Sequence, residues 1–166
     1  MTLNKSLGLA TLAAAAMTAL SLAPAWSADN TVEVTLVDKG SDAEMATGLA
    51  MGTPGADMAM ATMQVEVVAP ALHAGKVTFN VANGSSGTVH EMIVAPVPAA
   101  GKALPFDASM DRVDEDAAGD LGEVSELEPG QKGSLTLDLK PGRYVLFCNI
   151  PGHFDNGMWT VIDVGS

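Results

Sequence analysis

The stretch Tyr144-Val-Leu-Phe-Cys-Asn-Ile-Pro-Gly-His-Phe-Asp-Asn-Gly-Met-Trp159, near the end of the chain, decides both the expected fold and the expected site. It contains the only cysteine of the 166 residues, Cys148, followed at intervals of five residues by His153 and Met158. Thiolate, imidazole and thioether groups are ligands that copper accepts. Three such groups on one short loop predict a metal site.

The spacing of turn residues predicts that this loop is held between two strands. Val145-Leu-Phe147 is β-branched and aromatic, which favours a strand that ends at Cys148. Pro151-Gly152 predicts a turn that brings His153 back beside the sulfur, and Asn156-Gly157 predicts a second turn. A further strand is expected from Met158 to Val164. The three groups therefore lie at one end of a sheet.

Each residue also has an ordinary explanation when taken alone. A single cysteine is usually a small buried hydrophobe, a methionine fills a core, and a histidine is usually exposed or satisfied within the core. Their joint occurrence around a Pro-Gly-His turn favours the metal site. A second imidazole has to come from elsewhere, and His90 is well placed near the start of an expected strand. His73 precedes a turn and is predicted to be exposed and not to bind metal.

The segment Phe147-Cys-Asn-Ile-Pro-Gly-His153, with Gly157-Met158, resembles the ligand loop of the cupredoxins, the small blue-copper proteins. Its Cys-x4-His-x4-Met spacing is most similar to rusticyanin and sulfocyanin-like members, and Phe-Cys-x-x-Pro-Gly-His is similar to azurin. The resemblance covers about residues 64–166. It implies one type 1 copper ion, held by His90, Cys148 and His153 in a plane with Met158 as a weak axial ligand. It also implies electron exchange through His153, with an apolar contact patch formed by Pro151, Gly152, Phe154 and Met158.

The alternating segments of the chain indicate an all-β, Greek-key β-sandwich of about seven to eight strands, with the ligand loop at one end. The segments 76–82 and 88–94 are predicted to form a hairpin through the turn Asn83–Gly87. Residues 106–117 are predicted to form a short helix with Asp107 as its N-cap. We expect residues 28–166 to be one domain, with a strand and a Met-rich loop in 28–62 and the cupredoxin core in 63–166.

Residues 1–27 are typical of a cleavable signal peptide, with one positive charge at Lys5 followed by an apolar, Ala-rich run. An uncleaved anchor is the alternative, but a run of about 16 apolar residues is short for a membrane span. We therefore expect a periplasmic or otherwise exported protein without membrane insertion after cleavage.

The chain is strongly acidic, with 20 acidic and 8 basic side chains and a net charge of −12. Removal of the signal peptide takes away Lys5 and no acid, which leaves about −13. This charge argues against nucleic acid and anionic lipid as partners. It favours a cationic partner, such as a c-type cytochrome or another redox protein with a basic docking face. We also expect the protein to be a monomer.

These features predict a single-electron carrier rather than an enzyme. A copper oxidase or nitrite reductase needs further copper ions on several more histidines, and this chain has three in all. Methionine is a poor zinc ligand, so a structural zinc site does not fit. The alternative is copper binding or copper tolerance, in which Met45, Met51, Met58, Met60 and Met63 also capture Cu(I). Flexible apolar filler explains the same methionines better, because thioethers also pack well without any metal.

One residue departs from the resemblance. Azurin-like members have Asn after the first histidine, whereas this chain has Glu91. Strand alternation predicts that the Glu91 side chain points away from the metal. Asn149 is expected to supply part of the hydrogen bonding to the sulfur in its place. A carboxylate near copper favours Cu(II) and lowers the reduction potential.

Overall fold

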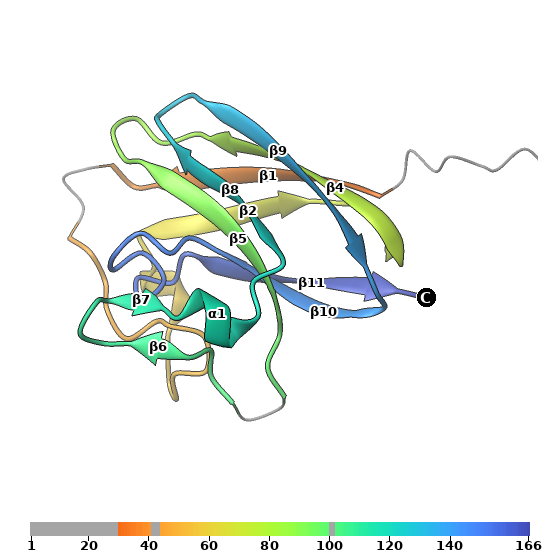
Figure 1. Ribbon diagram of the computed structural model, residues 1–166. Helices are drawn as coiled ribbons and strands as arrows, with labels where there is room; N and C mark the ends of the chain where they lie inside the picture. The colour runs from red at the N-terminus through yellow and green to blue at the C-terminus, as the bar shows by residue number, and fades with distance from the viewer. Residues whose placement is uncertain (1–29, 41–43, 100–101) are drawn as a thin grey trace, which may run out of the picture.

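The computed structural model describes residues 30–40, 44–99 and 102–166, and in these ranges the protein is nearly all-β (Figure 1). The predicted signal peptide, residues 1–27, lies outside the described residues. Among the described residues, no helix combines the length and the apolar character that a membrane span requires.

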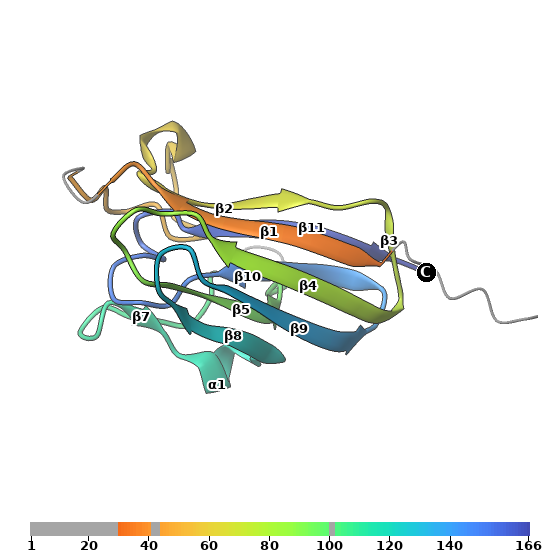
Figure 2. The ribbon, with the colours of Figure 1, turned by 90° about the horizontal axis from the view of Figure 1, so that it is seen from above.

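Two sheets pack face to face (Figure 2). One has the order β2-β1-β4-β9 and the other β3-β11-β10-β5-β8, and neighbours are antiparallel except β1 with β4 and β3 with β11. The strands of the first sheet are β1 (Thr31–Asp38), β2 (Met63–Val68), β4 (Gly75–Asn83) and β9 (Lys132–Leu139). Those of the second are β3 (Leu72–His73), β5 (His90–Pro96), β8 (Gly122–Leu127), β10 (Gly142–Phe147) and β11 (Trp159–Gly165). The predicted all-β sandwich is confirmed.

The main core lies between the sheets because the inward side chains alternate with polar ones along each strand. Val32, Val34 and Leu36 of β1 are buried, and their outward neighbours are exposed or half-buried. In the second sheet β5 and β10 are buried on both faces. Met92 faces the main core, whereas Ile93 packs in a second cluster on the outer face of the sheet.

The predicted hairpin of residues 76–82 and 88–94 is wrong. β4 pairs with β1 and β9, whereas β5 pairs with β10 and β8, so the two strands belong to opposite sheets. The crossing is fastened by Asn83, whose side chain is 1% exposed. Its Nδ2 donates to the carbonyls of Thr88 (2.8 Å) and Leu127 (2.7 Å), and its Oδ1 accepts from the Ser85 amide (2.9 Å). Alternation predicts which side chains of a strand point inward, but it does not tell which sheet the strand joins.

The predicted helix over residues 106–117 is also wrong. β6 (Phe106–Asp107) and β7 (Arg112–Val113) pair instead, and the helix α1 (Glu115–Ala118) follows them. Its N-cap is Asp114, which accepts from the Ala117 amide. Asp107 accepts from the Ser109 amide at 2.8 Å and so stabilises a turn. An aspartate with polar neighbours fits both a cap and a turn, which is why the pattern did not distinguish them.

Candidate metal centre

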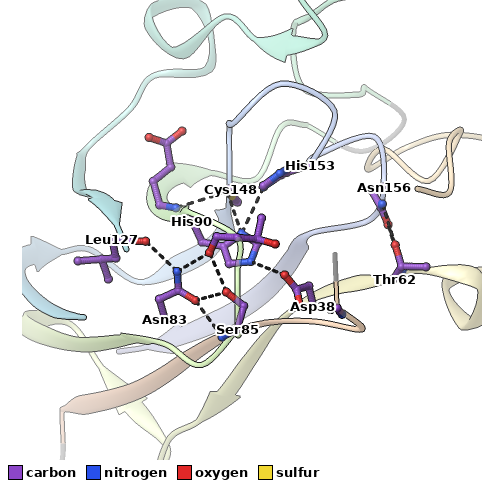
Figure 3. Close-up of polar contacts among 12 residues, drawn as sticks. Asp38, Thr62, Asn83, Ser85, His90, Leu127, Cys148, His153 and Asn156 are labelled. Carbon is purple, nitrogen blue, oxygen red and sulfur yellow. Dashed lines mark hydrogen bonds and ion pairs between the residues drawn. The ribbon is translucent and has the colours of Figure 1, made fainter. Parts of the chain in front are cut away.

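Three of the four predicted ligands are brought together at one end of the sandwich (Figure 3). Cys148 follows β10 directly, His90 opens the neighbouring strand β5, and His153 lies in the turn between β10 and β11. Because β10 and β5 are adjacent and antiparallel, the end of one meets the start of the other. Strand pairing therefore delivers His90 to the ligand loop from 58 residues away.

The donor atoms of His90, Cys148 and His153 all lie within 4.8 Å of one another. The Nδ1 atoms of the two histidines are 3.3 Å apart, and Cys148 Sγ is 3.3 Å from His153 Nδ1 and 3.9 Å from His90 Nδ1. His90 and Cys148 are 0% exposed, whereas His153 is 5% exposed. Among the described residues this is the only group of His, Cys, Asp or Glu side chains with such convergence.

Met158 lies beside these donors through its main chain. The Cys148 amide donates to the Met158 carbonyl at 3.1 Å, and the Met158 amide donates to the His153 carbonyl at 3.0 Å. Its side chain is fully buried in the cluster that also contains Cys148. This position is compatible with an axial thioether, and the ligand role of Met158 stays a prediction.

The electrostatics of the three donors suit a cation. Burial raises the pKa of the Cys148 thiol to about 12, against the opposing effect of the Glu91 and Ile150 amides. Burial, and then the neighbouring His90, lower the pKa of His153 to about 4. Burial also lowers the pKa of His90, although Asp38 opposes this. Without a cation all three groups are neutral. A bound metal ion would deprotonate the thiol to a thiolate. Two neutral imidazoles and a thiolate fit copper.

The hydrogen bond to the sulfur comes from Glu91 and not from the Asn149 side chain. The Glu91 amide donates to Cys148 Sγ at 3.4 Å. The Asn149 side chain instead accepts from the Val113 amide (2.7 Å) and donates to Glu115 Oε1 (2.7 Å), so the expected role of Asn149 is wrong. Every residue type except proline has a main-chain N–H to donate. Glu91 can therefore make this hydrogen bond where azurin-like members have Asn.

The Glu91 carboxylate lies against the ligand loop outside the donor cluster, where its Oε1 accepts from the Asn149 amide at 3.2 Å. Its side chain is 8% exposed. Burial, and then the charges of Glu123 and Glu115, raise its pKa to about 7. Below its ordinary pKa, 4.5, the group is protonated in both folded and unfolded protein. The cost of burying its charge appears as pH rises from 4.5 towards 7.

Glu91→Gln should therefore stabilise the metal-free protein at pH 8 by roughly 2 kcal/mol and have little effect near pH 4.5. The amide keeps the acceptor for Asn149 and removes the charge. Urea unfolding at the two pH values measures the difference. Glu66→Gln on the exposed face of β2 is the control for loss of one negative charge. Equal effects of Glu91→Gln at both pH values would contradict the assigned cause.

A segment that the ligand pattern did not reveal also holds the loop in place. Residues 44–62, here called the strap, run between β1 and β2 and include the 3-10 helix η1 (Met58–Met60). The Gly48 and Leu49 amides donate to Asp155, and the Trp159 indole donates to the Leu49 carbonyl at 2.8 Å. Thr62 Oγ1 donates to Asn156 Oδ1 at 3.0 Å (Figure 3). The strap thus fastens the loop between His153 and β11.

Two strap methionines lie over glycines of the ligand loop. A Cβ on Gly152 would lie 2.8 Å from Met45 Cε, and a Cβ on Gly157 would lie 3.0 Å from Met58 Cε. Both glycines have positive φ, 83° and 92°, which favours glycine on backbone grounds as well. Met63 is 8% exposed and packs in the core, so Met58, Met60 and Met63 do not form one surface cluster.

The surface around His153 differs from the expected apolar patch. Phe154 and Met158 are 1% and 0% exposed, so that prediction is wrong for these residues. Around Gly152 the exposed apolar side chains are those of Pro151, Met45 and Met110. The Gly152 amide donates to the Asp111 carbonyl, next to Met110. His73 is exposed on β3, as predicted.

Comparison with known proteins gives a family match at the end of the chain. A model of the Sulfocyanin (SoxE) domain matches residues 121–166, which contain β8 to β11 and three of the four predicted ligands. No curated protein sequence matches.

A solved structure of rusticyanin has a similar fold. Rusticyanin from Thiobacillus ferrooxidans is 18% identical, covers 81% of this chain and 77% of its own, and has a TM-score of 0.50. Reduced auracyanin from the photosynthetic bacterium Roseiflexus castenholzii is 19% identical, covers 82% of this chain and 98% of its own, and has a TM-score of 0.49. At 18% identity the likeness to rusticyanin concerns the fold alone.

Proposed function

We propose that this chain, which has the cupredoxin fold and a cupredoxin-like ligand loop, holds one type 1 copper ion and serves as a single-electron carrier. His90, Cys148 and His153 would be the strong ligands and Met158 a weak fourth one. The observation that supports this most directly is the convergence of the three donors within 4.8 Å at a buried end of the sandwich. Imidazole, thiolate and long thioether ligands are the set found in electron-transfer copper sites.

When bound there, copper would supply the exchange of one electron between Cu(II) and Cu(I). The protein would keep the ligand positions the same in both states. Cys148 is held by the β10–β5 pairing and by the hydrogen bond from its amide to the Met158 carbonyl. The strap holds Asp155 and Asn156, which follow His153 in the loop. Ligands that do not rearrange keep the reorganisation energy of electron transfer small. This favours electron transfer over catalysis.

The exchange would take place at His153, because it is the one imidazole of the site with measurable exposure. We infer a docking face around it made of Met45, Pro151 and Met110, with Asp111 beside them. Apolar thioethers next to acids on a chain with net charge −12 suit a redox protein with a basic docking face, such as a c-type cytochrome. We propose that this exchange occurs in the periplasm or elsewhere outside the cytoplasm, after cleavage of residues 1–27, and that the protein acts as a monomer.

Copper titration of the purified metal-free protein tests this function. We expect uptake of one equivalent of Cu(II) and a strong absorption band at roughly 600 nm from thiolate-to-copper charge transfer. The band should disappear on reduction and return on reoxidation. Zn(II), added in parallel, should leave the visible spectrum empty. Copper uptake without this band, or a band that does not return, would contradict the proposal.

Copper binding or tolerance is the second candidate, and the exposure of Met45 (42%), Met58 (37%) and Met60 (63%) favours it. Thioethers at the surface beside the ligand loop are suited to Cu(I). The two functions differ in a protein that lacks Cys148. Retained Cu(I) binding there would favour copper handling through the strap, whereas loss of all binding would favour the carrier.

A further inference from the structure

We propose that Asp38 is a positioning residue for the copper site, which selects the tautomer of His90 that binds the metal. This inference rests on the proposed function. Asp38 ends β1 and His90 opens β5, so the two side chains come from opposite sheets. Asp38 Oδ2 lies 3.7 Å from His90 Nε2 (Figure 3).

The first observation is that neither of these two atoms has a hydrogen-bond partner. In the described part of the chain, Asp38 Oδ2 and His90 Nε2 are the only buried side-chain polar atoms without a hydrogen-bond partner. A buried donor or acceptor left without a partner costs about 1–3 kcal/mol, and folded proteins rarely leave one. Two such atoms facing each other point to a state in which they are paired.

The chemistry of the ring identifies that state. A neutral imidazole has one N–H and one nitrogen with a free lone pair. His90 turns Nδ1 towards Cys148 Sγ and His153 Nδ1, so Nδ1 is the nitrogen that a metal would take. The proton then has to lie on Nε2, which faces Asp38. Metal binding at Nδ1 thus makes Nε2 a donor to Oδ2, and a shift of about 0.7 Å brings the pair from 3.7 Å to hydrogen-bond distance, about 3 Å.

Asp38 is oriented independently of the metal. Its Oδ1 accepts from the Gly40 amide at 2.9 Å, which leaves Oδ2 free to face the ring. The side chains of both partners are nearly inaccessible, at 4% for Asp38 and 0% for His90, so water does not compete readily for the bond. A carboxylate that accepts from the outer nitrogen of a ligating histidine fixes its ring and raises its basicity.

The negative charge should also favour the oxidised ion, because Cu(II) carries the larger charge. Loss of this charge should weaken Cu(II) binding 10- to 100-fold, which is roughly the effect of removing such a partner. Cu(I) binding should weaken less. Each tenfold change in the ratio of the two affinities raises the reduction potential by about 59 mV.

The test compares Asp38→Asn and Asp38→Ala with Glu66→Gln, an exposed control on neighbouring β2 that also removes one charge. Competition titrations measure Cu(II) and Cu(I) affinities, and voltammetry measures the potential. Asp38→Asn keeps the side-chain size and an acceptor, so it should retain the blue band with a raised potential. Asp38→Ala should show the larger loss of Cu(II) affinity. Glu66→Gln should leave affinities and potential nearly unchanged.

Nitrogen-detected NMR of the Cu(I)-loaded protein provides a separate readout. In the wild type we expect a slowly exchanging Nε2–H on His90, and in Asp38→Ala its signal should shift and exchange faster. If the wild type is blue and both Asp38 variants match Glu66→Gln in potential and NMR, the inference is overturned and the proposed function stands. A wild type that never becomes blue overturns the proposed function and, with it, this inference.

Discussion

Cys148→Ser should abolish the absorption band at roughly 600 nm, because that band arises from charge transfer between a thiolate sulfur and copper. A serine hydroxyl is nearly isosteric, but it stays protonated and does not replace the thiolate as a ligand. Cys148 is 0% exposed. We expect complete loss of the band and a steep fall in Cu(II) affinity. Visible spectroscopy during copper titration measures both.

His73→Ala is a suitable control for this experiment, because His73 is an exposed histidine on β3 and lies outside the donor cluster. It should retain the band at wild-type intensity. The serine variant should unfold in urea as cooperatively as the metal-free wild type, which separates ligand loss from misfolding. A folded Cys148→Ser protein that turns blue would refute the assignment of Cys148 as the copper thiolate.

Asn83→Ala should reduce the free energy of unfolding by about 3 kcal/mol, since it removes a buried side chain that satisfies several groups at once. The change removes the side-chain partner of the Leu127 carbonyl and the Ser85 amide, whereas the Thr88 carbonyl keeps its hydrogen bond from Ser85 Oγ at 2.7 Å. These groups lie where the chain passes from β4 to β5, just before His90. Copper affinity should therefore fall together with stability. Urea unfolding of the metal-free protein and a copper titration measure the two effects.

Asn80→Ala is the matched control, three residues earlier on the same strand. The Asn80 amide donates to Glu33 Oε1 at the surface, at 2.8 Å. Surface interactions of this kind contribute little, so we expect a loss below about 1 kcal/mol and an unchanged copper affinity. Similar losses in the two variants would show that the Asn83 network does not fasten the crossing between the sheets.

The ligand loop was largely predictable because its signals are local. The strand before Cys148, the turn at Pro151-Gly152 and the strand after Met158 all appear in the structure within a few residues of their predicted bounds. β8 was missed because its buried residues, Val124 and Leu127, stand among acids and are not evenly alternating. In that stretch the apolar alternation typical of a strand is weak, and the polar composition indicates a loop instead.

The sequence alone determined the all-β class, the ligand types and the end of the molecule at which they gather, because turn residues, alternation and side-chain chemistry act over a few neighbouring positions. Only the tertiary structure decided that β4 and β5 lie in opposite sheets, that Thr62 holds Asn156, and that Asp38 faces His90. These pairs are separated by up to 94 residues in the chain. Their meeting depends on which faces are buried together, and no local pattern records that choice.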